Sequence, residues 1–154
     1  LKPENLGHYT VYLPAYSDEF ILKKLSKHPD QKFQVFSKHT REDYSQENVE
    51  VYKVNNEKFN QSLAKSEGLL TGGGFEGPAE ALFLGKKLLC VPMFHQYEQQ
   101  CNALAAEKMG ATVIWSEKEF DQKLNHWLKN AEPIQVNFPD ETEEVIKNLI
   151  EKYS

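Results

Sequence analysis

The sequence predicts a doubly wound, Rossmann-like α/β domain with a six-stranded parallel sheet and helices on both faces. Short apolar and β-branched segments alternate about six times with longer amphipathic segments, which is the pattern of a parallel sheet covered by helices. A length of 154 residues suits one ordinary domain and is sufficient to bury a core. No repeat, low-complexity stretch or internal linker divides the chain. We therefore treat residues 1–154 as a single domain.

The first half of the chain is expected to hold three strands and two helices. Phe33, Val35 and Ser37 alternate as in a short strand. Ser17 is a plausible helix cap, and Pro29 would stop the helix that follows it. The expected order is strand 8–16, helix 17–29, strand 32–38, a polar loop 39–48, strand 49–54 and helix 55–66.

The second half repeats the alternation of strands and helices. Gly110 lies just past the end of one expected helix. Ser116 and Glu119 have the spacing of a capping box at the start of another. The expected order is strand 68–74 ending in glycines, helix 76–85, strand 87–93, helix 96–110, strand 111–115, helix 116–130 and an amphipathic helix 140–154.

Composition excludes several classes of function. The net charge of −5 argues against a nucleic-acid binder. No run of 18 apolar residues and no signal peptide occurs in this sequence, so we expect no transmembrane segment in this chain and a cytoplasmic location. Cys90 and Cys101 lack metal-type spacing and are interpreted as buried free thiols. Because neither Asp-x-Asp nor His-x-x-x-His occurs, we expect no metal and no cofactor.

The glycine-rich stretch "TGGGFEGPAEAL" at 71–82 carries the clearest functional signal. The glycines follow a strand and lead into a helix, so backbone amides and the helix N-terminus could bind a phosphate. Gly72, Gly74 and Gly77 satisfy G-x-G-x-x-G by spacing. However, they lie in the fourth strand–helix unit, and no Lys-Ser/Thr of a Walker loop follows. A tight turn without a ligand is the alternative.

Two polar groups follow this loop. Glu80, in the second turn of the expected helix, could accept hydrogen bonds from two ribose hydroxyls, or it could be a solvated surface residue. Glu98, Gln99 and Asn102 share one side of the helix after the next strand and suit a polyhydroxylated ligand, although a polar helix surface has the same pattern. His95 could be a loop residue, a phosphate contact or a base.

Together these motifs resemble the C-terminal, nucleotide-sugar-binding domain of GT-B-fold glycosyltransferases. The glycine turn, the Glu about six residues later, "ALFLGKKLLCVP" and "EQQCNA" occur in the expected order and spacing. The resemblance is closest to the group that contains the peptidoglycan-precursor GlcNAc transferase and the UDP-sugar transferases. It covers nearly the whole chain and is strongest over 68–115.

The resemblance implies roles for the matching positions. A donor that is expected to be a UDP-sugar would place its ribose on Glu80 and its base against the backbone near Val54. The diphosphate would lie on the backbone of the loop, and the transferred sugar would contact the amide-rich helix. The loop residues are Gly72, Gly73, Gly74 and Phe75, and the sugar contacts are Glu98, Gln99 and Asn102, with Asn102 in support.

The chain also departs from the family pattern. The first strand ends "LPAYSDE" without the glycine-rich loop of some members, which leaves the roles of Tyr16 and Ser17 open. Members have two such domains, and the N-terminal one binds the acceptor and commonly supplies the base. We therefore expect this chain to be the C-terminal half of a larger enzyme. Alone it should catalyse little, and any membrane association would come through the missing half.

Two other functions stay open at this stage. One is a stand-alone nucleotide-binding module, or the donor-binding subunit of a split transferase. The other is an epimerase-like enzyme of the same architecture, which would need acidic and His groups at the domain cleft. Beyond His95 the sequence offers no such set, so the transferase is the favoured hypothesis.

Overall fold

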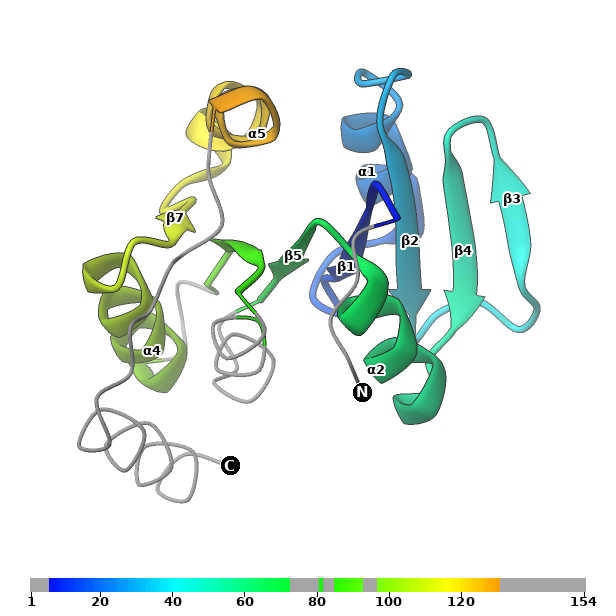
Figure 1. Cartoon of the computed structure of the whole chain (residues 1–154), viewed down its shortest axis with the longest axis horizontal. Helices are drawn as coiled ribbons and strands as arrows, with labels where there is room; N and C mark the ends of the chain where they lie inside the picture. The colour runs from blue at the N-terminus through cyan, green and yellow to red at the C-terminus, as the bar shows by residue number, and fades with distance from the viewer. Residues whose placement is uncertain (1–5, 73–80, 82–84, 93–96, 131–154) are drawn as a thin grey trace.

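A computed structural model describes residues 6–72, 81, 85–92 and 97–130. Its centre is a seven-stranded sheet in the order β3-β4-β2-β1-β5-β6-β7. Neighbouring strands are parallel except for the antiparallel pair β3 and β4. The strands are β1 His8–Tyr12, β2 Lys32–Ser37, β3 Tyr44–Gln46, β4 Val49–Lys53, β5 Gly68–Thr71, β6 Lys87–Cys90 and β7 Thr112–Val113. Figure 1 shows β2, β4 and β3 side by side, with β3 outermost.

The predicted sheet of six parallel strands is wrong by one strand. The additional strand, β3, lies inside the predicted polar loop 39–48 and pairs with β4. Glu47, with φ 54°, and Asn48 make the tight connection between the two. All three residues of β3 are exposed. This strand is therefore held by backbone hydrogen bonds to β4 and has no buried apolar side chains. Its sequence lacks the apolar pattern from which a strand is predicted.

The helices are α1 Asp18–Leu25, α2 Asn56–Lys65, α4 Tyr97–Lys108 and α5 Phe120–Asn130, with a 3₁₀ turn η1 Glu117–Glu119. The Ser17 cap is confirmed, because its Oγ accepts from the Phe20 N–H at 3.2 Å. The capping box at Ser116 is wrong. The Ser116 side chain makes no cap bond, and the Glu119 carboxylate instead accepts from the Trp115 N–H at 3.3 Å. The predicted helix 140–154 and most of 76–85 lie outside the described residues.

Two apolar clusters cover the two faces of the sheet. The larger combines side chains of β1, β2, β4, β5 and β6 with Ile21 and Leu25 of α1 and Leu124 and Trp127 of α5. The second combines other side chains of β5, β6 and β7 with Leu63 of α2 and the α4 residues Ala103 and Ala106. Helices therefore bury both faces, and the doubly wound class is confirmed.

A buried polar network lies between α2 and the sheet. Ser62 Oγ is 2.7 Å from Thr10 Oγ1, and it donates to Gln34 Oε1 at 2.7 Å. His8 Nε2 lies 3.0 Å from the Ser62 carbonyl oxygen. Because buried polar groups need partners, this network fixes α2 over β1 and β2 in one register.

The strand order reverses between β1 and β5. From β1 the chain proceeds outward to β2 and β4, crosses back through α2 to β5 on the other side of β1, and continues to β6 and β7. In open α/β sheets the crevice beyond the carboxyl ends of the strands at such a reversal is the usual ligand site. The ends of β1 and β5 are therefore the places to examine.

Candidate functional site

Backbone hydrogen bonds join the end of β5 to the ends of β1 and β6 at the carboxyl edge of the sheet. The Gly72 N–H donates to the Tyr12 carbonyl at 3.3 Å, and the Val91 N–H donates to the Thr71 carbonyl at 2.8 Å. A Cβ on Gly72 would meet no more than ordinary contact, 3.9 Å from the Val91 oxygen. Among the described residues, Gly72 thus leaves open space where the predicted phosphate loop begins. Gly73, Gly74 and Phe75 lie outside the described residues.

The loop after β1 places Tyr16 and Ser17 at the same edge. The Tyr16 ring stacks on Phe20 with centroids 4.9 Å apart, and burial, with a smaller contribution from Glu117, raises the pKa of the Tyr16 hydroxyl. Ser17 Oγ is occupied by its capping bond, and the first turn of α1 carries Asp18 and Glu19. The negative charges of these two carboxylates would repel an anion, so the start of α1 is poorly suited to binding a phosphate.

Ser37, the last residue of β2, ties two edge loops together. Its Oγ lies 2.7 and 2.9 Å from the two carboxylate oxygens of Asp18 and accepts from the N–H groups of His39 and Thr40 at 3.0 and 3.2 Å. His39 Nε2 lies 3.3 Å from the Pro14 carbonyl. The loop after β2 is therefore held against the loop after β1. The sequence assigned Ser37 only to a strand and gave neither Ser37 nor Asp18 a role at this edge, because a serine that ends a strand carries no functional signal.

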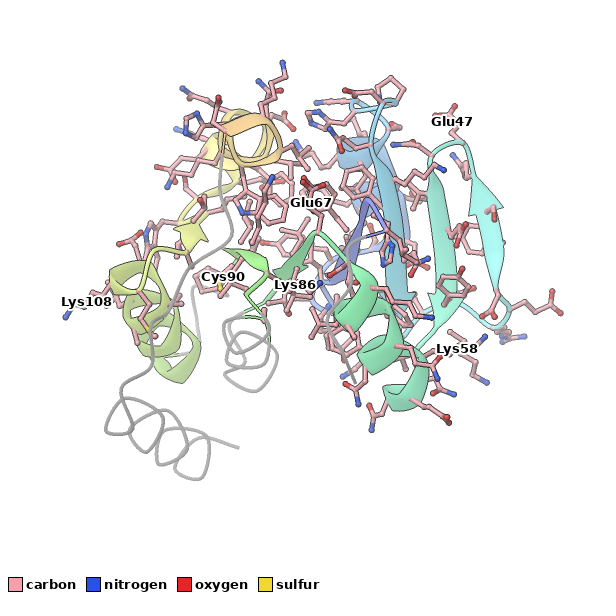
Figure 2. The ribbon with its side chains drawn as sticks, in the orientation of Figure 1. Glu47, Lys58, Glu67, Lys86, Cys90 and Lys108 are labelled. Carbon is pink, nitrogen blue, oxygen red and sulfur yellow. The ribbon has the colours of Figure 1, made fainter. Side chains whose placement is uncertain are left out.

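Val54 follows β4 and is 40% exposed. Its N–H donates to the Ser37 carbonyl at 3.1 Å, so a base edge could meet the carbonyl of Val54 but not its amide. Asn55 caps α2, with Oδ1 accepting from the Lys58 N–H at 3.1 Å. Lys58, labelled in Figure 2, marks this first turn of α2.

The other predicted contacts are less fully described. Glu98, Gln99 and Asn102 lie in α4, the helix after β6, but their side chains are outside the described part of the structure. Glu80 and His95 lie outside the described residues altogether.

Cys90 ends β6 (Figure 2) and is free and buried, as predicted, and burial raises the pKa of its thiol to about 12. Its thiol is therefore inert at neutral pH. Cys101 lies in α4, and its side chain is outside the described set. Within residues 6–72, 81, 85–92 and 97–130, three or more His, Cys, Asp or Glu side chains nowhere gather as a metal would require. In the same residues no helix has the length and apolar character needed to span a membrane.

Strand order and helix placement together define a doubly wound α/β domain, a class in which ligands usually bind beyond the carboxyl ends of the strands where the strand order reverses. The profile of glycosyl transferase family 1 matches residues 1–132. The chain belongs to this family, and it is a glycosyltransferase domain. No curated protein matches it significantly.

Solved structures share the fold at low identity. An NMR structure of ALG13 has a TM-score of 0.61 and 10% identity, over 97% of this chain and 98% of that one. The glycosyltransferase SnogD from Streptomyces nogalater has a TM-score of 0.61 and 13% identity, over 99% of this chain and 41% of that one. MurG from Acinetobacter baumannii has a TM-score of 0.57 and 14% identity, over 98% of this chain and 50% of that one. The chain thus spans half or less of SnogD and MurG but nearly all of the ALG13 structure.

Proposed function

We propose that this chain is the donor-binding half of a glycosyltransferase that transfers a hexosyl group from a UDP-sugar to an acceptor hydroxyl. The observation that supports the proposal most is the open backbone at Gly72, at the strand-order reversal of a glycosyl transferase family 1 domain. Ligands of doubly wound domains bind at this position, and an unsubstituted backbone lets a phosphate approach closely.

Each part of the donor has a proposed contact. The backbone amides of 73–75 would hold the diphosphate and stabilise the charge that develops on the leaving UDP, while Gly72, whose N–H is donated to the Tyr12 carbonyl, would let the phosphate approach. Glu80 would accept hydrogen bonds from the ribose hydroxyls, and the carbonyl of Val54 would contact the base. Glu98 and Gln99, with Asn102 in support, would orient the sugar so that an acceptor hydroxyl can attack its anomeric carbon. No metal is needed in this scheme, because N–H groups of the loop and of the helix N-terminus would stabilise the charge of the diphosphate by hydrogen bonding.

The acceptor half is proposed to come from elsewhere. The chain covers 41% of SnogD and 50% of MurG, which supports a second domain in the complete enzyme. That domain would bind the acceptor and supply the base. The present chain also covers 98% of the ALG13 structure. This coverage favours an alternative in which the donor-binding half is a separate subunit with a partner. Both arrangements assign the same chemistry to this chain.

Calorimetric titration with UDP, GDP and ADP tests the proposal. We expect UDP to bind most tightly and Gly72→Ala to weaken it, because a methyl group would occupy space needed by the phosphate. Gly72→Ala should unfold at the same temperature as the wild type, since in the described part of the chain its Cβ meets nothing closer than 3.9 Å. Glu80→Ala should also weaken UDP, whereas Gln99→Ala should weaken a UDP-sugar more than UDP. Absence of any nucleotide binding at millimolar concentration would contradict the proposed function.

A further inference from the structure

Four aromatic side chains form a connected cluster at the carboxyl edge, on the face covered by α2. We call Tyr12, Phe36, Tyr52 and Phe59 the aromatic surface. Ring centroids are 6.0 Å apart for Tyr12 and Phe59, 5.4 Å for Phe36 and Phe59, and 5.6 Å for Phe36 and Tyr52. The first two pairs are edge-to-face, the geometry that aromatic rings favour. The cluster is therefore a rigid platform built by three strands and a helix.

The cluster is not simply part of the core. Phe36 is buried at 2% exposure, but Tyr12, Tyr52 and Phe59 are all partly exposed. Tyr12 belongs to neither buried apolar cluster. Within the described residues, no hydrogen bond to the Tyr12 hydroxyl occurs. Tyr12 is thus a large aromatic side chain at a strand end that is partly exposed and, among the described residues, has no partner for its hydroxyl, so it could contact a ligand.

The aromatic surface lies next to two proposed donor contacts. Tyr12 accepts the hydrogen bond from the Gly72 N–H, so its backbone adjoins the start of the proposed phosphate loop. On the other side, Phe59 lies one turn into α2 from Val54 and Asn55. Because Asn55 Oδ1 is used by its cap bond, its Nδ2 remains as a donor, and the Val54 carbonyl remains as an acceptor. Because the Tyr12 and Phe59 ring planes are inclined by 64°, a planar group that stacks on one ring meets the other ring at its edge. Such an apolar corner, with one acceptor and one donor at its rim, suits a nucleobase.

We propose that the nucleobase of the donor stacks on the Tyr12 ring and contacts the Phe59 ring at its side, with its polar edge toward Val54 and Asn55. This inference rests on the proposed function. It adds two side chains that contact the base through their rings to the backbone contact already proposed at Val54. A uracil ring would donate its N3–H to the Val54 carbonyl and accept from Asn55 Nδ2 through a ring carbonyl. Ring stacking provides affinity for any base, and the rim contacts would select among bases.

Leucine and phenylalanine substitutions separate stacking from folding. Tyr12→Leu should weaken UDP by about 5- to 150-fold, the range for loss of one base–aromatic stack. Phe59→Leu should weaken UDP less, because it removes the side contact. Tyr12→Phe keeps the ring and should bind UDP as the wild type does. Tyr44→Leu removes a tyrosine that is 38% exposed on the edge strand β3, and should change nothing. Affinities come from calorimetry, and thermal unfolding shows that each variant is folded.

A measurement on the unmodified chain provides an independent test. Stacking on an aromatic ring should shift the H5 and H6 proton resonances of bound UDP upfield, which NMR titration detects without any substitution. We expect the loss of affinity in Tyr12→Leu to be the same for UDP and for a UDP-sugar. A loss confined to the UDP-sugar would place the sugar, not the base, on Tyr12 and overturn the inference.

Failure of this inference is distinguishable from failure of the proposed function. If the wild-type chain binds none of UDP, GDP and ADP, the proposed function itself is wrong. If the wild type binds UDP while Tyr12→Leu and Phe59→Leu bind it equally well, or if H5 and H6 do not move upfield, the stacking surface alone is wrong.

Discussion

Gly68 of β5 lies directly against Trp127 of α5. A Cβ on Gly68 would lie 3.0 Å from Cη2 of the indole and 2.9 Å from Cβ of Lys87. The Trp127 ring is 1% exposed and packs on Tyr9 of β1 with centroids 5.0 Å apart. The missing side chain at Gly68 therefore lets α5 approach the centre of the sheet.

Gly68→Ala should destabilise the fold, because neither the strand backbone nor the buried indole has room to move. We expect the free energy of unfolding to fall by about 1–3 kcal/mol, the usual cost of overpacking a core. Urea denaturation measures it. Gly72→Ala is the matched control in the same segment, since the atom of the described residues that its added methyl group meets is the Val91 oxygen, at 3.9 Å. Equal stability of the two variants would show that Trp127 does not need this space.

Ser37→Ala should loosen the attachment of the loop after β2. The substitution removes the partner of the Asp18 carboxylate and of the His39 and Thr40 N–H groups, and Ser37 is only 3% exposed. Loss of a buried hydrogen-bond partner should cost about 1–3 kcal/mol of unfolding free energy, and hydrogen exchange at His39 and Thr40 should accelerate. Ser45→Ala on the exposed strand β3 is the control and should be neutral. Unchanged exchange at both amides would contradict the proposed attachment.

Stability should decline as the pH falls below about 6.5, partly because of His8. Burial lowers the pKa of His8 below its ordinary value of 6.5, against the opposing effect of its hydrogen bond to the Ser62 carbonyl. The unfolded chain therefore takes up a proton before the native one does. This contribution to stability is complete above pH 6.5 and is lost as the pH falls toward the native pKa.

His8→Gln keeps a hydrogen-bond donor and removes the titration. Its unfolding free energy, from urea denaturation at several pH values, should depend less steeply on pH between about pH 6.5 and 5 than that of the wild type. Some slope should remain, because burial also lowers the pKa of His28. The hydrogen bond from Lys27 is the main cause that lowers the pKa of Asp121 below 3.8. Asp121 therefore titrates at lower pH than His8 and does not interfere. Identical slopes for wild type and variant would show that His8 is not the titrating group.

Strongly patterned segments made most of the fold predictable. The six parallel strands and α1, α2, α4 and α5 were expected close to their observed places, because their apolar residues recur at the period of the element they form. Tyr44, Ser45 and Gln46 could not reveal β3, since an exposed edge strand is held by backbone bonds that have no side-chain signature. Ser116 and Glu119 have the spacing of a capping box, but a 3₁₀ turn at Glu117–Glu119 takes the place of the first α-helical turn.

The sequence predicted where in the fold the candidate site lies better than it predicted which side chains meet there. Glycines after a strand indicate a phosphate loop from sequence alone, and Gly72 does lie at the strand-order reversal. The ring contact between Tyr12 and Phe59 was not foreseeable, because it joins residues 47 positions apart through the crossover of α2. Likewise, the bond between Ser37 and Asp18 depends on how α1 packs beside β2.

The central position of β1 has a consequence for synthesis on the ribosome. β1 is the first strand of the sheet to emerge, yet one of its two neighbours, β5, begins 60 residues after β1 does, at Gly68. Until β5 has been synthesised, the backbone groups on one side of β1 have no strand to pair with. Thr10 of β1 likewise lacks its hydrogen-bond partner Ser62, which lies 52 residues further along the chain. We expect the nascent half-sheet of β1, β2, β3 and β4 to be the stage most exposed to wrong pairing with other chains, and the emergence of β5 to end it.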